Sequence, residues 1–586
     1  MAAAAPRRAL MDGPAVSRQE ADATLTAPGQ LFEVGEEVIR GIPTRVWRNA
    51  PPTLGAVLEQ SRAHGDAVFL VYEDERITFS EHYRRAAALA HRLVEDYGVR
   101  PGDRVAIAMR NFPEWPVAFW ATAAAGGVVV PLNAWWTGPE LAYGLTDSGA
   151  RVLFADQERM ERLEPHLDAE LAGLAGATVV ARSEGPVRAG AVRFEDLLTP
   201  DVVAGATGLP DPGVGPEDDA TIFYTSGTTG VPKGAVGTHR NICTNLWSLF
   251  FTNARASLRR AGAAPPAGGA GGQNAYLLSV PFFHATGCHS VLVANTAVGG
   301  KLVMMYRWNP ERALELIERE QITTFGGVPA MVMQVLDSPD FEKRDISSVR
   351  SVAYGGAPAP PDLVRRIRQH FPGGQPSNGY GLTETSSVST MNNGDDYIRK
   401  PDSVGPPVPV VEIKVVDADG GQLPLGEIGE LWIKGPNVVR GYWNKPDATA
   451  DSFTDGWLHT GDVARIDDEG FVYIVDRAKD MVIRGGENVY CVEVEAALHE
   501  SEAVAECAVI GIPHPVLGEE VGAVVRLRAG ASVTEEDLRR HVAERLAAFK
   551  VPVRVWIRDE ELPRNPAGKV LKRELREELL GAETSG

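Results

Sequence analysis

Four short apolar runs recur between residues 104 and 181, and helix-like stretches separate them. The runs are RVAIAM (104–109), GGVVVPL (126–132), RVLFA (151–155) and TVVA (178–181). Short runs without polar alternation are typical of strands buried on both faces, as in a parallel sheet covered by helices. Their alternation with helices therefore predicts an α/β fold of layered sheets and helices.

The chain is long for a single hydrophobic core, at 586 residues, and its texture changes after residue 475. There a compact, charged α+β module begins, in which Thr534 and Asp537 form a capping pattern before a helical run that reaches residue 549. Residues 1–30 lack an apolar core of signal-peptide length and are predicted to be a disordered leader. We therefore expect a large N-terminal domain over residues 31–478 and a small, mobile C-terminal domain over residues 479–586.

The composition excludes several classes of protein. A net charge of −20 repels nucleic-acid phosphate and anionic lipid, which argues against a DNA or RNA binder. Two uncharged stretches, residues 115–133 and 271–300, are interrupted by proline, glycine or polar residues, so we expect buried core and not membrane spans. The four cysteines show no C-x-x-C spacing, which predicts neither a disulfide framework nor a zinc site. A cytoplasmic protein is expected.

The segment YTSGTTGVPKGA (224–235) combines hydroxyls, glycines and one lysine. Its glycines permit backbone conformations in which successive N–H groups converge on an oxyanion, and Lys233 supplies a point charge. Pro232 before this lysine and Gly234 after it exclude the common G-x-x-x-x-G-K-[ST] phosphate loop. Taken alone, the segment fits either a different phosphate loop after the predicted strand 221–224 or a surface turn.

Four further motifs carry groups that suit a nucleotide. In NGYGLTETS (378–386), Thr383 offers a hydroxyl and Glu384 a carboxylate for Mg²⁺, although this pair is also common in solvated turns. Asp462, which ends GWLHTGD (456–462), can accept hydrogen bonds from both hydroxyls of a ribose. The other motifs are YGGAP (354–358), VDRAKDMVIRGGENVY (475–490) with Arg477 and Lys479, and LPRNPAGKVLKREL (562–575) with Lys569.

Together these motifs resemble the adenylate-forming superfamily, which includes acyl-CoA synthetases, adenylation domains of peptide synthetases and firefly luciferase. The resemblance extends from about residue 50 to residue 575, with the motifs in the family's order. It implies that a carboxylate attacks the α-phosphate of ATP, giving an acyl-adenylate and pyrophosphate, and that a thiol, usually CoA, then displaces AMP. A carboxylic acid is already ionised at neutral pH, so the first step requires positioning and charge relief and no general base.

The resemblance implies a role for each matching residue. The implied ATP contacts are Thr225, Ser226, Gly227, Thr228, Thr229, Gly230 and Lys233 for the β- and γ-phosphates, Gly355, Gly356, Ala357, Pro358 and Tyr380 for the adenine, and Asp462 and Arg477 for the ribose. Thr383 would contact the α-phosphate, Glu384 would hold Mg²⁺, and Lys569 would bridge the α-phosphate and the attacking carboxylate. Lys479 would be the hinge about which the small domain turns after the first step. That turn would withdraw Lys569 and present Gly485 and Gly486 to the thiol.

The acid is specified by fewer residues. The family's acyl pocket maps onto residues 238–241, 281–287 and 323–331, where the candidate contacts are His239, His284, Gly326, Gly327 and Val328. The two glycines either leave room for a long or bulky chain or serve backbone geometry. His284 is either a substrate contact or a structural histidine. No charged residue in these segments would demand the ammonium group of an amino acid.

These observations predict a medium- or long-chain fatty-acid CoA ligase that uses ATP, Mg²⁺ and CoA, as a monomer or homodimer. Two alternatives are an aryl-acid CoA ligase and an adenylating enzyme that passes its acyl group to a carrier protein or another nucleophile. A third is a nucleotide-binding protein without turnover, which is disfavoured because Lys233, Glu384 and Lys569 are all present.

Overall fold

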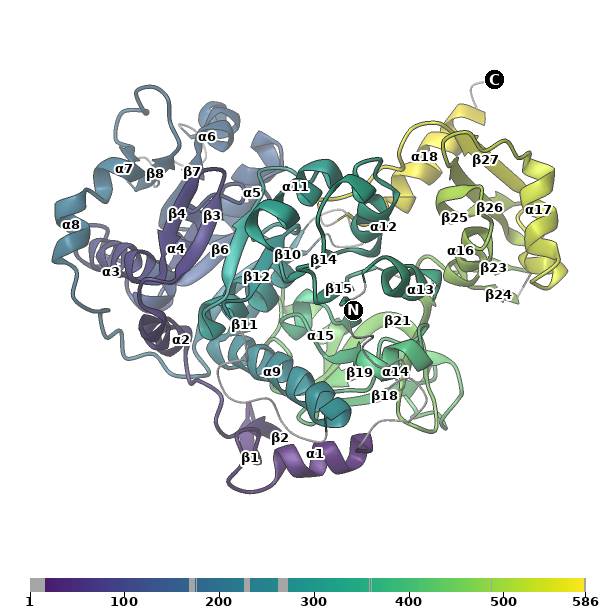
Figure 1. Ribbon diagram of the computed structural model, residues 1–586, viewed down its shortest axis with the longest axis horizontal. Coiled ribbons are helices and arrows are strands. Elements are labelled where there is room, and N and C mark those ends of the chain that lie inside the picture. The colour runs from purple at the N-terminus through teal and green to yellow at the C-terminus, as the bar shows by residue number, and fades with distance from the viewer. Residues whose placement is uncertain are drawn as a thin grey trace, which may run out of the picture.

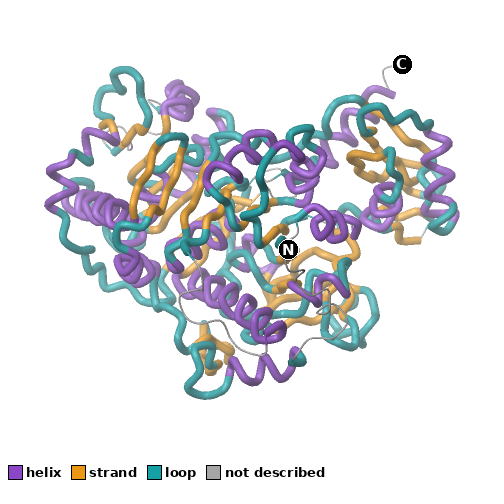
Figure 2. The backbone as a smooth tube through the Cα atoms, in the orientation of Figure 1, coloured by secondary structure: helices purple, strands orange, loops and turns teal. Residues whose placement is uncertain are grey.

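The computed structural model describes residues 16–167, 174, 177–225, 232–261, 272–357, 359, 361–371, 373–485, 487–566 and 568–583. Figure 1 shows a large body and a smaller lobe, which contains β23 to β27 and is coloured light green to yellow. Helices flank the strands in both parts (Figure 2). Within the described residues, no helix is both long enough and apolar enough to cross a membrane.

The first sheet of the body contains the four predicted strands. Its strand order is β11-β10-β6-β5-β7-β8-β9, and β5 pairs in parallel with β6 and β7, as β7 does with β8. The strands are β5 (Arg104–Ala108), β6 (Val128–Pro131), β7 (Val152–Asp156), β8 (Thr178–Ala181), β9 (Val192–Arg193), β10 (Asp219–Thr225) and β11 (Lys233–Thr238). Every residue of β6, β7 and β8 is buried, which confirms the predicted strands and α/β layering. The segment 115–133 is core, because helix α4 (Glu114–Ala124) buries nearly its whole length beside α3 (Phe79–Glu95).

The second sheet directs several chain turns to one edge. Its order is β17-β16-β15-β14-β12-β13-β3-β4, and the strands from β16 to β3 are parallel. The strands are β3 (Val68–Tyr72), β4 (Glu75–Thr78), β12 (Ala275–Leu278), β13 (Lys301–Met304), β14 (Thr324–Gly327), β15 (Ser351–Gly355), β16 (Gln375–Tyr380) and β17 (Thr390–Asn393). The segments that follow β12, β14, β15 and β16 therefore leave the sheet at the same edge, which is where open α/β sheets bind ligands. Helices α11 (Pro310–Glu320), α12 (Pro329–Asp337) and α13 (Pro361–His370) belong to this layer.

A third, antiparallel sheet completes the body and leads into the smaller lobe. It consists of β18 (Glu412–Val416), β19 (Gly429–Lys434), β20 (Phe453–Thr454), β21 (Trp457–Ile466) and β22 (Val472–Arg477). The smaller lobe contains β23 (Val482–Arg484), β24 (Glu487–Val489), β25 (Val504–His514), β26 (Gly518–Leu527), β27 (Arg554–Arg558), α16 (Cys491–His499), α17 (Glu535–Ala543) and α18 (Lys572–Glu583). The boundary predicted after residue 478 falls in the connection between β22 and β23.

Two local predictions need correction. The capping box of Thr534 and Asp537 is present, but α17 ends at Ala543 and does not continue to residue 549. A short 3-10 turn, Ala548–Lys550, follows instead and packs Phe549 against the core of the smaller lobe.

The predicted disordered leader contains a helix, α1 (Arg18–Thr26), which starts with a capping box between Ser17 and Glu20. Its buried side chains, Ala21 and Leu25, belong to a hydrophobic cluster shared with α9 (His239–Ala261). Residues 1–15 lie outside the described part of the chain.

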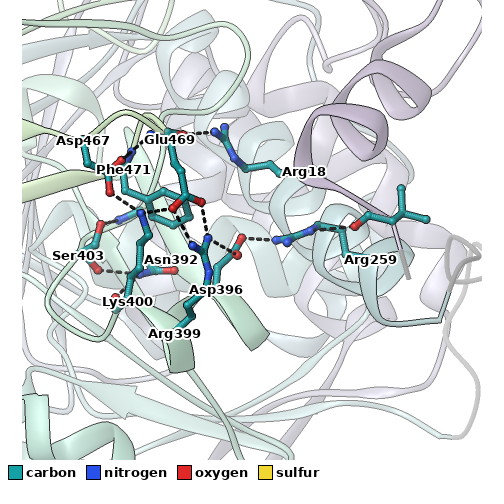
Figure 3. A network of polar contacts seen from close by, with 12 residues as sticks. Arg18, Arg259, Asn392, Asp396, Arg399, Lys400, Ser403, Asp467, Glu469 and Phe471 are labelled. Carbon is teal, nitrogen blue, oxygen red and sulfur yellow. Dashed lines mark hydrogen bonds and ion pairs between the residues drawn. The ribbon is translucent and has the colours of Figure 1, made fainter. Parts of the chain in front are cut away.

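A polar network fastens this helix to the body (Figure 3). Arg18 donates to the backbone carbonyl of Glu469, and Arg259 of α9 pairs with Asp396. In the same network Lys400 pairs with Asp467 and Glu469. These partners lie between 67 and 451 residues apart in sequence, so local composition does not indicate them.

Candidate active site

A cleft of about 2000 Å³ separates the body from the smaller lobe, and both parts line it. The residues predicted for nucleotide binding or catalysis that line it are Gly356, Ala357, Tyr380, Asp462, Arg477, Lys479 and Lys569. The connections after β15 and β16, the β21–β22 pair and the loop before α18 therefore converge, although they span more than 200 residues of sequence. A site built from three layers in this way is a place where a ligand can contact both parts of the chain at once.

Asp462, the predicted ribose contact, lines the cleft and is held by two neighbouring side chains. The antiparallel register of β21 and β22 places it opposite Arg477. Arg477 Nε donates to Asp462 Oδ1 at 2.9 Å, and the Tyr380 hydroxyl donates to Oδ2 at 2.6 Å. Burial and the adjacent carboxylate raise the pKa of Tyr380, so its hydroxyl remains a donor. The carboxylate is thus held in one orientation, with further lone pairs able to accept from a vicinal diol.

The predicted adenine contacts lie where β15 and β16 approach closely. A Cβ added at Gly355 would lie 2.4 Å from the carbonyl oxygen of Gly379, so no larger residue fits there. Gly356 has a φ of 76°, a conformation that favours glycine. These two positions turn the chain with bare backbone facing outward, which suits contact with a flat base. Pro358 lies outside the described residues.

Lys233 and Glu384, the predicted phosphate and Mg²⁺ contacts, are not among the described residues that line the cleft, but both contact Tyr442, a residue that sequence reasoning missed. Lys233 opens β11 opposite Thr225 of β10, and the intervening Ser226, Gly227, Thr228, Thr229 and Gly230 lie outside the described residues. Lys233 Nζ lies 5.2 Å from the centre of the Tyr442 ring, and the hydroxyl of Tyr442 donates to Glu384 Oε1 at 2.8 Å. No motif marks Tyr442, because it belongs to a loop that pairs with β11 from two hundred residues away.

The side chains of Lys233, Thr383 and Glu384 fit the charges of a metal–triphosphate complex. Thr383 and Glu384 open the short 3-10 turn Thr383–Thr385 and are both half-buried. A carboxylate oxygen is a preferred ligand of Mg²⁺, and a neighbouring lysine suits phosphate oxygens. With Mg²⁺ bound, Glu384 would hold the ion, which would neutralise phosphate charge, while Lys233 and Thr383 would orient the phosphates.

Lys569 reaches the cleft from a turn that is built around Asn565. The amide of Lys569 donates to Asn565 Oδ1 at 2.9 Å, and the amide of Asn565 donates to the Lys569 carbonyl at 2.8 Å. A Cβ at Gly568 would lie 2.6 Å from Val328 Cγ2, so this turn packs directly on the body. Burial, together with the charge of Arg477, lowers the pKa of Lys569, while Asp480 and Asp462 act in the opposite sense. In this orientation of the lobe, Lys569 therefore lines the same cleft as Arg477 and Asp462.

The predicted hinge residue, Lys479, lines the cleft, whereas Gly485 of the predicted thiol loop does not. Burial and the charges of Arg477 and Lys233 lower the pKa of Lys479, which lines the cleft. Gly485 has a φ of 59°, and its amide donates to the Leu517 carbonyl at 2.8 Å in the smaller lobe. It is not among the described residues that line the cleft, whereas Lys569 is. Gly486 lies outside the described residues.

The residues predicted to line the acyl pocket have different environments in the structure. His239 accepts a hydrogen bond from the Leu54 amide through Nδ1. It directly follows the last residue of β11, whereas Lys233 is the first residue of that strand. The Nδ1 atom thus has a structural role, while Nε2 of His239 has no hydrogen-bond partner among the described residues. A Cβ at Gly326 would lie 1.5 Å from the Ala353 carbonyl oxygen, and Gly327 has a φ of 138°, so backbone geometry requires both glycines.

Two further imidazoles, those of half-buried His284 and buried His289, have unsatisfied nitrogens. Within the part of the chain that the structure describes, Nε2 of His284 and Nε2 of His289 have no hydrogen-bond partner, and burial lowers both pKa values to about 4, so the rings are neutral. His289 Nδ1 lies 3.2 Å from the Ser386 carbonyl oxygen, which places this ring directly behind the turn of Thr383 and Glu384. His289 belongs to a π-helix, Thr286–Val293, a feature frequent at functional sites. Sequence reasoning identified His284 and missed His289.

The fold and the residues of this cleft define a class of two-domain enzymes with a candidate nucleotide site between a large body and a small lobe. The model of the AMP-binding enzyme family matches residues 57–443, and that of the AMP-binding enzyme C-terminal domain matches residues 493–569. A feruloyl-CoA synthase from Amycolatopsis sp is 37% identical over 500 residues, which cover 85% of this chain and 93% of the relative. A long-chain-fatty-acid–CoA ligase from Bacillus subtilis (strain 168) is 33% identical over 557 residues, covering 90% and 94%.

Solved structures agree with this assignment. An anthranilate CoA ligase in complex with anthranoyl-AMP has a TM-score of 0.81 and 27% identity, covering 91% of this chain and 98% of that one. The o-succinylbenzoate CoA synthetase of Bacillus subtilis, bound to its acyl-adenylate, has a TM-score of 0.72 and 29% identity, covering 90% and 98%. The chain belongs to the AMP-binding enzyme family and is an acyl-CoA ligase that uses ATP, Mg²⁺ and CoA. The family, the fold class and the reaction class were thus predicted correctly from the sequence.

Proposed function

We propose that the enzyme activates an aryl acid that carries a hydrogen-bonding substituent, and transfers it to CoA. The observation that carries this proposal is the pair of buried, unpartnered Nε2 atoms of His284 and His289. An acid whose carboxylate meets the α-phosphate near Thr383 would lie close to the segment that carries these rings, because His289 Nδ1 lies 3.2 Å from the Ser386 carbonyl oxygen. A hydroxyl or amino substituent could satisfy one of them.

The same observation disfavours a saturated chain, which the sequence alone had favoured. A buried polar atom left without a partner costs about 1–3 kcal/mol, and a hydrocarbon ligand cannot supply one. The ring of Phe283 lies 5.1 Å from that of His284, which adds an aromatic surface to this wall. The similarity to a feruloyl-CoA synthase and to an anthranilate CoA ligase supports an aryl acid. The long-chain-fatty-acid ligases among the relatives support the alternative.

In the proposed first step, the ionised acid attacks the α-phosphorus of ATP and pyrophosphate leaves. Lys569 would hold both the carboxylate and an α-phosphate oxygen, so that their charges do not oppose the approach. Asp462 would fix the ribose, and Lys233 would bind the departing pyrophosphate. The small domain would then turn about Lys479, which removes Lys569 and opens the carbonyl carbon to the CoA thiol.

Arg110 is a candidate contact for the nucleotide part of CoA. Arg110 is 9% exposed, and its Nε has no hydrogen-bond partner among the residues that the structure describes. Its guanidinium lies 5.1 Å from the Trp135 ring centre and 5.4 Å from that of Tyr306. Trp135 is 47% exposed, and the adjacent Trp136 lines the cleft. An arginine that can bind a phosphate beside an exposed indole that can stack on a base suits a nucleotide at the mouth of the cleft.

Specificity constants over a panel of acids test the proposed substrate class. We expect kcat/KM for hydroxylated or aminated benzoates and cinnamates to exceed that for saturated acids of similar volume. In His284→Phe, kcat/KM should fall about tenfold for substituted acids, equivalent to ~1.4 kcal/mol, and should change little for their unsubstituted parents. Preference of the wild type for saturated fatty acids would refute the assignment.

A further inference from the structure

Asp476 is a buried carboxylate at the junction between the two domains that the reaction described above does not use. It is the next-to-last residue of β22 and is 2% exposed. Its Oδ1 accepts from the Arg477 amide at 2.7 Å, and its Oδ2 accepts from the amide of Cys491, the first residue of α16. Asp476 belongs to the body and Cys491 to the smaller lobe, so the hydrogen bond between them spans the predicted hinge at Lys479.

A second element of the smaller lobe faces the same carboxylate. The positive charge of Lys572 stabilises ionised Asp476, and Lys572 Nζ also pairs with Glu495 Oε1 of α16 at 2.7 Å. Lys572 opens α18 and follows Lys569 by three residues. Asp476 is therefore linked both to the start of α16 and to the segment that delivers Lys569 into the cleft.

We propose that Asp476 is a positioning residue that holds the small domain in the orientation in which Lys569 faces the ATP site. This inference rests on the proposed function, because it assumes a turn of the small domain about Lys479. In such a turn Asp476 would remain with the body, while the Cys491 amide and Lys572 would move with the lobe. The carboxylate then stabilises one of the two orientations, and so favours the adenylation step over the thiol step.

The electrostatics of Asp476 agree with a positional role. Burial raises its pKa to about 6, against the opposing effects of Lys572 and of the Arg477 and Cys491 amides, with Glu495 acting in the same sense as burial. An ionised carboxylate at this position is thus retained at a cost to folding. The charge of Asp476 therefore does not stabilise the folded state at neutral pH.

Separate assays of the two half-reactions test the proposal. In Asp476→Ala, ATP–pyrophosphate exchange should slow roughly tenfold to a hundredfold, the range for loss of a hydrogen bond to a charged group. Thioester formation from a supplied acyl-adenylate and CoA should stay within about twofold. Asp476→Asn keeps an acceptor for the Cys491 amide and should show a smaller split in the same direction. If Asp476→Ala does not fold, this variant decides alone.

Asp467→Asn is a matched control. Asp467 is a carboxylate next to the same β21–β22 pair and is held by Lys400 and Tyr473, but it belongs to the network that fastens α1 (Figure 3) and not to the hinge. Its loss should lower stability without separating the two half-reactions.

A crosslink supplies a readout that a purely structural role would not change. Asp337 of α12 pairs with Arg528 of the smaller lobe at 2.7 Å, and both side chains are about one-third exposed. The four native cysteines are buried, so D337C and R528C can be joined selectively with a short bis-maleimide. This lock should restore pyrophosphate exchange to Asp476→Ala and suppress the thiol step. Equal loss of both half-reactions without rescue would overturn the inference, whereas absence of both in the wild type would instead reject the proposed function.

Discussion

Replacing Tyr442 by phenylalanine should weaken ATP use through loss of its hydrogen bond to Glu384, the predicted Mg²⁺ ligand. The hydroxyl of Tyr442 donates to Glu384 at 2.8 Å, and burial together with this carboxylate raises its pKa, so it is a donor at every physiological pH. A hydrogen bond to a charged group contributes about 1.5–3 kcal/mol when buried. Glu384 is half-buried, and solvent reduces the loss to about 1 kcal/mol.

Tyr442→Phe should therefore lower kcat/KM for ATP about fivefold in the pyrophosphate-exchange assay. The ring of Tyr442 remains beneath Lys233 in this variant. Tyr442→Ala also removes that cation–π contact, worth a further ~0.5–1 kcal/mol, so its total loss should approach 30-fold. Both losses should grow when Mg²⁺ is scarce, because Glu384 would orient less well.

Tyr83→Phe is the matched control, because its hydroxyl also donates to a glutamate, Glu59, and neither residue belongs to a predicted nucleotide motif. Tyr83→Phe should lower thermal stability about as much as Tyr442→Phe does, but it should leave kcat/KM for ATP unchanged. If Tyr442→Phe also leaves kcat/KM for ATP within twofold, or slows only the thiol step, the assignment of Lys233, Tyr442 and Glu384 to the phosphate site is wrong.

Three further predictions address other parts of the site. Lys569→Ala should slow adenylation about 10²- to 10³-fold, as loss of one charge-stabilising group does elsewhere, and spare thioester formation from a supplied adenylate; equal loss in both assays would contradict its role. Arg110→Ala should raise KM for CoA about tenfold and leave KM for ATP unchanged, and an unchanged KM for CoA would remove Arg110 from the nucleotide contact. The raised pKa of Asp476 means that the folded state binds its proton more tightly than the unfolded state does, so its contribution to stability falls as pH rises from about 4 to about 6 and stays low above that. Asp476→Asn should consequently unfold at a higher temperature than the wild type at pH 8, with the difference disappearing near pH 4, and lower stability at pH 8 would show that the carboxylate serves the fold.

The parts of the molecule that local sequence controls were predictable. The buried parallel strands appear as uninterrupted apolar runs, because both of their faces are covered. Asp462 and Arg477 were both assigned to one ligand from their motifs, and the register of β21 and β22 places them opposite each other.

Residues whose roles depend on distant partners were not predictable. Tyr442 acquires its role only when its loop pairs with β11, and Asp476 when α16 and Lys572 pack against it. Helix α1 was missed because Ala21 and Leu25 are buried by elements more than two hundred residues away. The two glycines of β14 showed the converse, since a backbone requirement there is indistinguishable in sequence from room for a substrate.

The most direct test of the central claim is AMP release measured with ATP, a panel of acids, and CoA present or absent. The structure predicts release that requires CoA and is fastest with aryl acids bearing a hydroxyl or amino group. Pyrophosphate exchange without stimulation of AMP release by CoA would contradict the ligase assignment. Turnover confined to saturated fatty acids would contradict the assignment of His284 and His289 to the acyl site.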